Sequence, residues 1–387
     1  LALRKGETWT ASRKAVSEWI VAEEGAGGNA ALSLDRVKLD AFLAARATSI
    51  ATKPKNAVFE EKDGKVTKFE PGVDGESLDV DGSAKAIRAA LFDAEATVGA
   101  VKLPLTAVPP AITTEKSNAY GIKEIIGVGE SNFAGSPKNR RHNIAIGAKS
   151  VHGTLVPPGE EFSMLTTLGT IDGTTGYLQE LVIKGNETKP EYGGGLCQIG
   201  STAFRGALAS GLLITERRNH SYRVPYYERD GDGKYIGPGK DATIYDPAPD
   251  FKFRNDTGHH VLITTAIAGN RLSFIFWGTK DGRTSSQTDA RVFNIVQPPP
   301  KKIIETDTLK PGEEKCTEKP HVGSDAVFTY TVKYADGTEK KTDFRSHYRP
   351  WQEVCLVGRD PNAPLAPDGE TPDGNMPSLD AGGAAGN

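Results

Sequence analysis

A run of three glycines just before a cysteine limits the folds open to this chain more than any other stretch. Gly193 to Gly195 precede Cys197 within the segment EYGGGLCQIGSTAFRGALASG. Glycine reaches backbone dihedrals that are closed to other residues, so the segment predicts a tight turn that another group can approach closely. Small and apolar residues then recur every three or four positions up to Gly211, which predicts a helix that begins near Gln198 and buries one face.

Cys197 is therefore expected at the start of a helix. The unpaired amides and the dipole at a helix start stabilise a thiolate and lower the pKa of a cysteine thiol, so the position suits a nucleophile. The turn also makes Gly193, Gly194 and Gly195 candidate binding residues. The alternative is a buried structural cysteine beside a tight turn, which is a common environment for a free cysteine.

Composition narrows the class of protein. The chain has 387 residues, which is enough for two or three domains with a substantial core. Its net charge is -3 and no basic stripe is interleaved with aromatic residues, so we expect no nucleic-acid partner. The 43 glycines and 24 prolines predict many turns, and hence a mixed α+β fold. No apolar run is long enough to span a bilayer.

The first hundred residues alternate predicted helices with extended segments. Helices are predicted at 11–20, 35–49 and 82–92, with Thr10, Ser33 or Asp35, and Asp81 as their caps. An Asp63-Gly64 pair between two short extended segments is typical of a hairpin turn. We therefore predict a small α+β domain over residues 1–106 and a proline-containing linker over 107–125.

A second α+β domain is predicted over residues 126–298. A helix-like stretch near its start contains Arg140, Arg141 and Asn143. The planar fork of arginine suits carboxylates, so these three residues are candidates for holding a carboxylate or an anionic polymer. The alternative is a solvated helix face.

The residues after the cysteine helix supply its candidate partners. Alternating side chains over 221–226 predict a strand with His220 at its entrance, and three aspartates follow. We hypothesise that Cys197 attacks a carbonyl, that His220 is the base, and that an aspartate orients the imidazole. Spacing leaves the choice of aspartate open among Asp241, Asp246 and Asp250; we take Asp241 for the catalytic role and Asp250 for binding.

The same hypothesis needs a group that stabilises the oxyanion. The amide of Gln198, its side chain, or the amides of the glycine turn are candidates. The alternative is that His220 is a hydrogen-bonded structural histidine and that the aspartates only cap turns. The candidate residues lack the short paired spacing of zinc ligands, so we expect no metal and no cofactor.

A small β module is predicted over residues 299–358. Two strands flank an Asp336-Gly337 turn, and Cys316 and Cys355 lie in the same segment, where a disulfide would close its ends. Such a bond suggests an oxidising compartment and leaves Cys197 as the unpaired thiol. Residues 359–387 are rich in Pro, Gly, Ala and Asp and are predicted to be disordered.

Three segments in order resemble the VanW family, which is named from a glycopeptide-resistance cluster: RRHNIAIGAKSVHGTLVPPGEEFSM, GGGLCQIGSTAFRGALASGLLITERRNHS and DATIYDPAPDFKFRND. The upstream region resembles a peptidoglycan-binding domain found ahead of some cell-wall transpeptidases. The resemblance rests on two strands joined by an Asp-Gly turn and on the segment PGVDGESLDVDGSAKAIRAAL that follows them. The C-terminal strands and SHYRPWQEVCLVG are similar to the G5 module of wall-associated proteins, although the cysteine pair and Trp351 depart from its usual pattern.

These resemblances imply an extracytoplasmic protein of the cell envelope whose partner is peptidoglycan or another envelope polymer. Because the chain begins at Leu1 and not at methionine, we expect that a signal peptide or a membrane anchor preceded it. The first functional hypothesis is a Cys-His-Asp hydrolase or transpeptidase acting on peptidoglycan stem peptides. However, no Ser-Gly-Cys-Arg signature of the familiar L,D-transpeptidases surrounds Cys197. The alternative is a non-catalytic envelope-binding or scaffold protein linked to vancomycin resistance.

Overall fold

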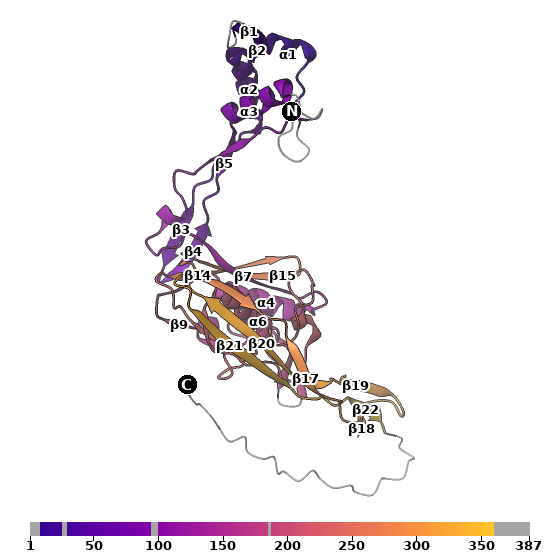
Figure 1. Cartoon of the computed structure of the whole chain (residues 1–387). Coiled ribbons are helices and arrows are strands. Elements are labelled where there is room, and N and C mark those ends of the chain that lie inside the picture. Colours follow the sequence, from indigo (N-terminus) through magenta and orange to yellow (C-terminus); the bar gives the residue numbers. More distant parts are fainter. Residues whose placement is uncertain (1–7, 25–28, 94–99, 185–186, 360–387) are drawn as a thin grey trace.

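The predicted α+β class is confirmed. The structure is a computed structural model that describes residues 8–24, 29–93, 100–184 and 187–359. Helices and strands are both abundant, and the strands form several small sheets (Figure 1). The predicted disordered tail lies outside the described residues, apart from Arg359.

The N-terminal helices form a small core of their own. They are α1 (Arg13–Trp19), α2 (Arg36–Ile50) and α3 (Val80–Phe92), accompanied by the hairpin of β1 (Ile20–Glu24) and β2 (Ala30–Leu34). Trp19, Leu39 and Leu43 are buried in this core. The predicted caps of α1 and α3 are wrong, because the Ser12 and Asp79 side chains accept the hydrogen bonds from the first-turn amides.

Two extended connections lead from these helices to the main body. Strands β5 (Gly75–Leu78) and β6 (Leu105–Val108) pair with each other, and the short helix η1 (Glu115–Ser117) follows. Strands β3 (Val58–Lys62) and β4 (Lys65–Glu70) form the predicted hairpin, with positive φ at Asp63 and Gly64. Strand β4 then joins β8 (Thr154–Val156), so this hairpin extends the sheet of the main body. The division into domains stays a prediction.

The main body is a six-stranded sheet covered by two helices. Its order is β3-β4-β8-β14-β15-β7, where β7 is Glu124–Asn132, β14 is Val261–Ala268 and β15 is Arg271–Gly278. Helices α4 (Lys138–Val151) and α6 (Leu196–Ala209) contact each other and this sheet (Figure 1). A Cβ on Gly129 would lie 2.2 Å from the Thr202 carbonyl oxygen, so glycine lets α6 pack closely on β7.

A second, smaller sheet lies beside this helix layer. Strands β12 (Leu213–Glu216), β13 (Lys252–Arg254) and β9 (Glu161–Ser163) form it, and the short helix α5 (Met164–Leu168) follows β9. The strand predicted over 221–226 is wrong. That segment is irregular and runs into the short helix η2 (Pro225–Glu228), because Pro225 has no N–H to donate to a sheet and its fixed φ suits a helix start.

The C-terminal strands form two sheets. The predicted hairpin is β20 (Gly323–Lys333) and β21 (Glu339–Tyr348), and β20 also pairs with β16 (Thr284–Gln287) and β17 (Arg291–Val296). Phe328, Tyr330 and Val332 of β20 belong to the main hydrophobic core. The other sheet contains β18 (Lys302–Thr306), β22 (Val354–Gly358) and β19 (Glu314–Glu318).

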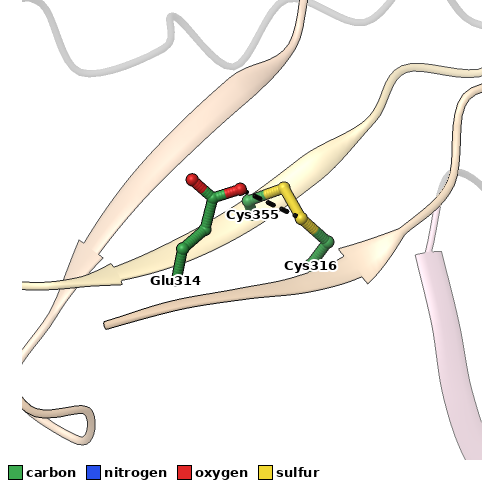
Figure 2. Close-up of side chains that lie close together, drawn as sticks. All are labelled: Glu314, Cys316 and Cys355. Carbon is green, nitrogen blue, oxygen red and sulfur yellow. Dashed lines mark hydrogen bonds between the residues drawn. A yellow bond between two sulfur atoms is a disulfide. The ribbon is translucent and has the colours of Figure 1, made fainter. Parts of the chain in front are cut away.

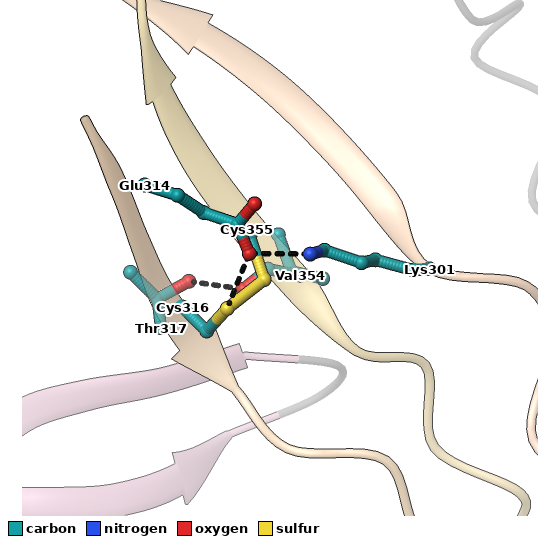
Figure 3. The surroundings of a disulfide bond; sticks show 6 residues. All are labelled: Lys301, Glu314, Cys316, Thr317, Val354 and Cys355. Atoms are coloured by element: carbon teal, nitrogen blue, oxygen red, sulfur yellow. Dashed lines mark hydrogen bonds and ion pairs between the residues drawn. A yellow bond between two sulfur atoms is a disulfide. The ribbon is translucent and has the colours of Figure 1, made fainter. Parts of the chain in front are cut away.

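The predicted disulfide is present. Cys316 on β19 and Cys355 on β22 are directly opposite each other and are bonded (Figure 2). Glu314 Oε1 lies 3.4 Å from Cys316 Sγ and pairs with Lys301 (Figure 3). Because both sulfurs are in the bond, neither is a thiolate that would ligate a metal ion.

Candidate functional site

The glycine turn places Cys197 in the first turn of α6. The helix begins at Leu196, two residues before the predicted start, and φ is 113° at Gly195 and 82° at Gly193. These left-handed values explain why glycine occupies both positions. Cys197 is half-buried, and its thiol donates to the Ile244 carbonyl oxygen over 3.5 Å. The structure therefore leaves part of this side chain accessible.

His220 and Asp241 meet beside Cys197. Asp241 Oδ2 lies 2.6 Å from His220 Nδ1 and also accepts from the His220 backbone amide over 2.8 Å. Both residues are buried. The carboxylate thus fixes the imidazole in place, and His220 and Cys197 line the same cavity. Of the three aspartates left open by spacing, it is Asp241 that contacts His220.

Asp241 is itself held by two residues that sequence reasoning missed. Arg217 Nη2 pairs with Asp241 Oδ1 over 3.1 Å, and the Tyr348 hydroxyl donates to the same oxygen over 2.8 Å. Both partners are buried. Tyr348 belongs to β21, 107 residues farther along the chain, so no local sequence signal connects it with the site.

The electrostatics of the three residues favour a charged cysteine and histidine. Burial alone would raise the pKa of the Cys197 thiol. The hydrogen bond and the charge of His220 outweigh burial, so the pKa of the thiol is lowered. Burial likewise opposes the charged imidazole, yet Asp241 and Cys197 raise the pKa of His220 to about 9. Despite burial, His220 and Arg217 hold the pKa of Asp241 well below its usual range. The surroundings therefore stabilise the Cys197 thiolate and the His220 imidazolium more than water stabilises them in a free cysteine and a free histidine.

A cavity of about 760 Å³ opens onto Cys197 and His220. One wall is the hairpin of β10 (Gln179–Lys184) and β11 (Glu187–Tyr192), which contributes Leu181 and Tyr192. The lining also includes Tyr226 and Tyr227, and the Tyr227 ring stacks on His220 with centroids 4.6 Å apart. The cavity is large enough for several residues of a peptide.

The three predicted binding residues on α4 have different roles. Arg140 lines the cavity, and its Nη2 donates to Gln198 Oε1 over 2.8 Å. Arg141 donates a hydrogen bond to the side-chain oxygen of Asn270. The Asn143 side chain is buried. The Asn143 amide donates to the carbonyl oxygens of Leu178 and Gly194, so it holds the turn in shape. Among these three residues, only Arg140 lines the cavity.

The remaining predicted residues also have definite partners. Gln198 is buried, and its Nε2 donates to Ser131 Oγ and to the Asn132 carbonyl oxygen. Both side-chain amide hydrogens are thus engaged, and the Gln198 backbone amide donates to the Gly195 carbonyl oxygen over 3.0 Å. The backbone amides of Cys197, Gly194 and Gly195 are then the candidates for an oxyanion site. Asp250 accepts from Ser163 Oγ over 2.6 Å and from the Leu165 amide, so it anchors α5. Gly193 and Gly195 line the cavity, and Gly194 packs against Glu180.

Two family models and two curated relatives match this chain. Residues 139–277 match the family described as VanW like protein, and residues 4–98 match the family described as "Putative peptidoglycan binding domain". The chain is 34% identical over 140 residues to the uncharacterized protein YoaR of Bacillus subtilis (strain 168), covering 36% of this chain and 43% of the relative.

The second relative is the Vancomycin B-type resistance protein VanW of Enterococcus faecalis (strain ATCC 700802 / V583). It is 32% identical over 120 residues, covering 31% of this chain and 42% of the relative. The chain therefore spans less than half the length of either relative. Cys197, His220 and Asp241 fall inside the VanW-like match, whereas Tyr348 lies beyond it.

The two family matches point to the cell envelope. A peptidoglycan-binding family suggests that the chain binds a cell-wall polymer, and a VanW-like region downstream agrees with association with the cell wall. Within the described residues, no helix has the length and apolar character needed to cross a bilayer. The chain thus carries a VanW-family domain, preceded by a domain of the peptidoglycan-binding family.

Proposed function

We propose that this protein is a cysteine-dependent enzyme that hydrolyses or transfers peptidoglycan stem-peptide bonds. The observation that carries the proposal is the buried His220, whose Nδ1 is held 2.6 Å from Asp241 in the cavity that the half-buried Cys197 also lines. This order of nucleophile, base and orienting acid is the arrangement that cysteine acyl-transfer enzymes use.

The reaction follows from the charges of these groups. The Cys197 thiolate attacks the peptide carbonyl carbon, and backbone amides at the start of α6 stabilise the oxyanion. His220 then gives its proton to the leaving amine, so the peptide bond breaks and a thioester remains on Cys197. Water, or an acceptor amine, loses a proton to His220 and attacks the thioester. The acyl group leaves as an acid or a new amide, and the thiolate is restored.

The N-terminal region would hold this site on its substrate. We propose that residues 1–106 bind peptidoglycan and that the VanW-like domain acts on stem peptides nearby. The disulfide between Cys316 and Cys355 supports an extracytoplasmic location, because such bonds persist in oxidising compartments.

A second candidate is a non-catalytic receptor for envelope peptides, linked to glycopeptide resistance. The observation that favours it is the aromatic lining of the cavity by Tyr192, Tyr222 and Tyr226. Tyrosine rings offer apolar area and hydroxyl groups that suit peptide binding without chemistry. In that case Cys197 would only help to shape the pocket.

The two candidates are separated by peptidoglycan digestion. Purified peptidoglycan would be incubated with the full chain and with Cys197→Ala, and the released muropeptides would be compared by liquid chromatography and mass spectrometry. The enzyme proposal expects new muropeptides from the full chain and none from the variant, with peptidoglycan pull-down unchanged. Identical muropeptide profiles for the chain, the variant and a no-protein control would overturn it and leave the receptor.

A further inference from the structure

Arg140 carries a positive charge that the described part of the protein does not neutralise by an ion pair. Its Nη1 donates to Ser136 Oγ over 2.6 Å, and its Nη2 donates to Gln198 Oε1 over 2.8 Å. A weaker contact of 3.4 Å joins Nη2 to the Tyr226 hydroxyl, whose ring lies under the guanidinium. All these acceptors are neutral, so the bonds orient the charge without compensating it.

The charged groups around Cys197 include one more cation than anion. Arg217 pairs with Asp241, and a positive charge on His220 would be balanced by a thiolate at Cys197. Arg140 is the third cation of this group, close enough to act on the Cys197 thiol through its charge. A partly buried cation loses part of its hydration energy, and without a neighbouring anion no ion pair compensates that loss. A site that contains such a cation is therefore suited to an anionic ligand.

The guanidinium is also built into the cavity wall. A Cβ on Gly195 would lie 2.9 Å from Arg140 Cγ, so the glycine turn makes room for this side chain. The other carboxylates of the lining do not pair with Arg140. Glu180 accepts from the Leu181 amide, Glu191 accepts from the Tyr245 hydroxyl, and Asp246 is exposed.

We propose that Arg140 binds a free carboxylate of the substrate beside Cys197. The substrate class is then an acyl donor peptide that carries a carboxylate close to the bond under attack, and not an internal bond of a neutral or amidated peptide. Arginine suits this role because its charged N–H groups form strong hydrogen bonds to carboxylate oxygens. The inference rests on the proposed role of Cys197 but can fail separately from it.

A pair of alkylating reagents tests the carboxylate site without any knowledge of the substrate. Iodoacetate and iodoacetamide both transfer a two-carbon group to a thiolate with loss of iodide, but only iodoacetate carries a carboxylate. The rate of Cys197 labelling by iodoacetate, divided by the rate by iodoacetamide, should fall about tenfold in Arg140→Gln, as expected for loss of a charged hydrogen bond. Any change in the thiol pKa affects both reagents alike and cancels in the ratio.

Lys149→Gln is the matched control, because it removes one positive charge from an exposed position in the last turn of the same helix. It should keep the ratio of the unmodified chain. Arg140→Lys should give an intermediate ratio, since the charge remains and the fork is lost. Equal ratios for the chain, Arg140→Gln and Lys149→Gln would overturn the proposal.

A binding measurement covers the case in which the thiol reacts with neither reagent. Calorimetry with Cys197→Ala would compare one stem peptide bearing a free C-terminal carboxylate with the same peptide as its carboxamide. The carboxylate form should bind about tenfold more tightly, and Arg140→Gln should remove that difference. Equal binding of the two peptides, or no binding of the carboxylate form, contradicts the proposal. If the carboxylate form binds more tightly than the carboxamide but the full chain cleaves no peptidoglycan, only the enzyme proposal is contradicted.

Discussion

The three cysteines of this chain lie in two contrasting environments. Cys316 and Cys355 face each other across two strands and are joined, so their sulfurs serve the covalent framework of a small sheet. Cys197 is half-buried at a helix start, beside a histidine that is fixed by a carboxylate. The comparison teaches that the partners around a thiol, and not its burial alone, decide whether it is suited to structure or to chemistry.

The largest expected effect separates these two roles. Cys197→Ala should remove at least about a thousandfold of the peptidoglycan activity, because no other described group can form the thioester. The paired change Cys316→Ser with Cys355→Ser should instead lower the free energy of unfolding by about 2 to 4 kcal/mol and keep most of the activity. Muropeptide analysis and thermal unfolding measure the two effects, and the reverse pattern would contradict the comparison.

A pair of aspartates sharpens the picture of the Cys197 environment. Asp241→Asn should reduce the rate of the peptidoglycan reaction by about a hundred- to ten-thousandfold, because the amide no longer stabilises the imidazolium or fixes its orientation. Asp250→Asn is the control. It weakens the anchor of α5 and should cost about 1 kcal/mol of stability with little change in rate. Similar rates for both variants would remove Asp241 from the mechanism.

The pH dependence of alkylation tests the coupling between Cys197 and His220. The imidazolium lowers the thiol pKa, so the thiolate forms at a lower pH than in a free cysteine and is lost as the pH falls through that lowered pKa. His220→Gln should move the midpoint of the rate profile to higher pH and slow iodoacetamide labelling at pH 7 about tenfold. An unchanged profile would show that His220 does not activate the thiol. Circular dichroism would verify that the variant is folded.

The smallest effect concerns Tyr348, which reaches the site from outside the VanW-like match. Tyr348→Phe removes a buried donor to Asp241 and should slow alkylation of Cys197 a few-fold. Tyr330→Phe is the control, because it deletes a buried hydroxyl that donates to the Leu212 carbonyl oxygen, away from the nucleophile. Each change should cost about 1 kcal/mol of stability. If Tyr330→Phe slows labelling equally, the effect of Tyr348 is only structural.

Sequence reasoning succeeded where the signal is local. The Asp63-Gly64 and Asp336-Gly337 turns, the glycine turn before Cys197 and the cysteine pair were all predictable, because each depends on neighbouring residues or on a short segment. The α+β class followed from the same local patterns. The strand predicted over 221–226 was wrong because alternation of side chains did not allow for Pro225.

The parts that sequence could not supply are long-range contacts. Spacing left three aspartates open for His220, and the choice of Asp241 depends on how distant loops meet. Arg217 and Tyr348 were missed for the same reason, since the fold brings them together from separate elements. The difference between Arg140 and its neighbours on α4 depends on which side of the helix faces the cavity.

The measurement that bears most directly on the central claim is detection of the thioester. Stem peptides would be mixed with the full chain, the reaction quenched in acid within seconds, and the peptide containing Cys197 analysed by mass spectrometry. We predict a mass increase equal to the donor minus its leaving amine, confined to Cys197 and removed by hydroxylamine. Product formation without any adduct on Cys197, at a rate that Cys197→Ala shares, would contradict the account.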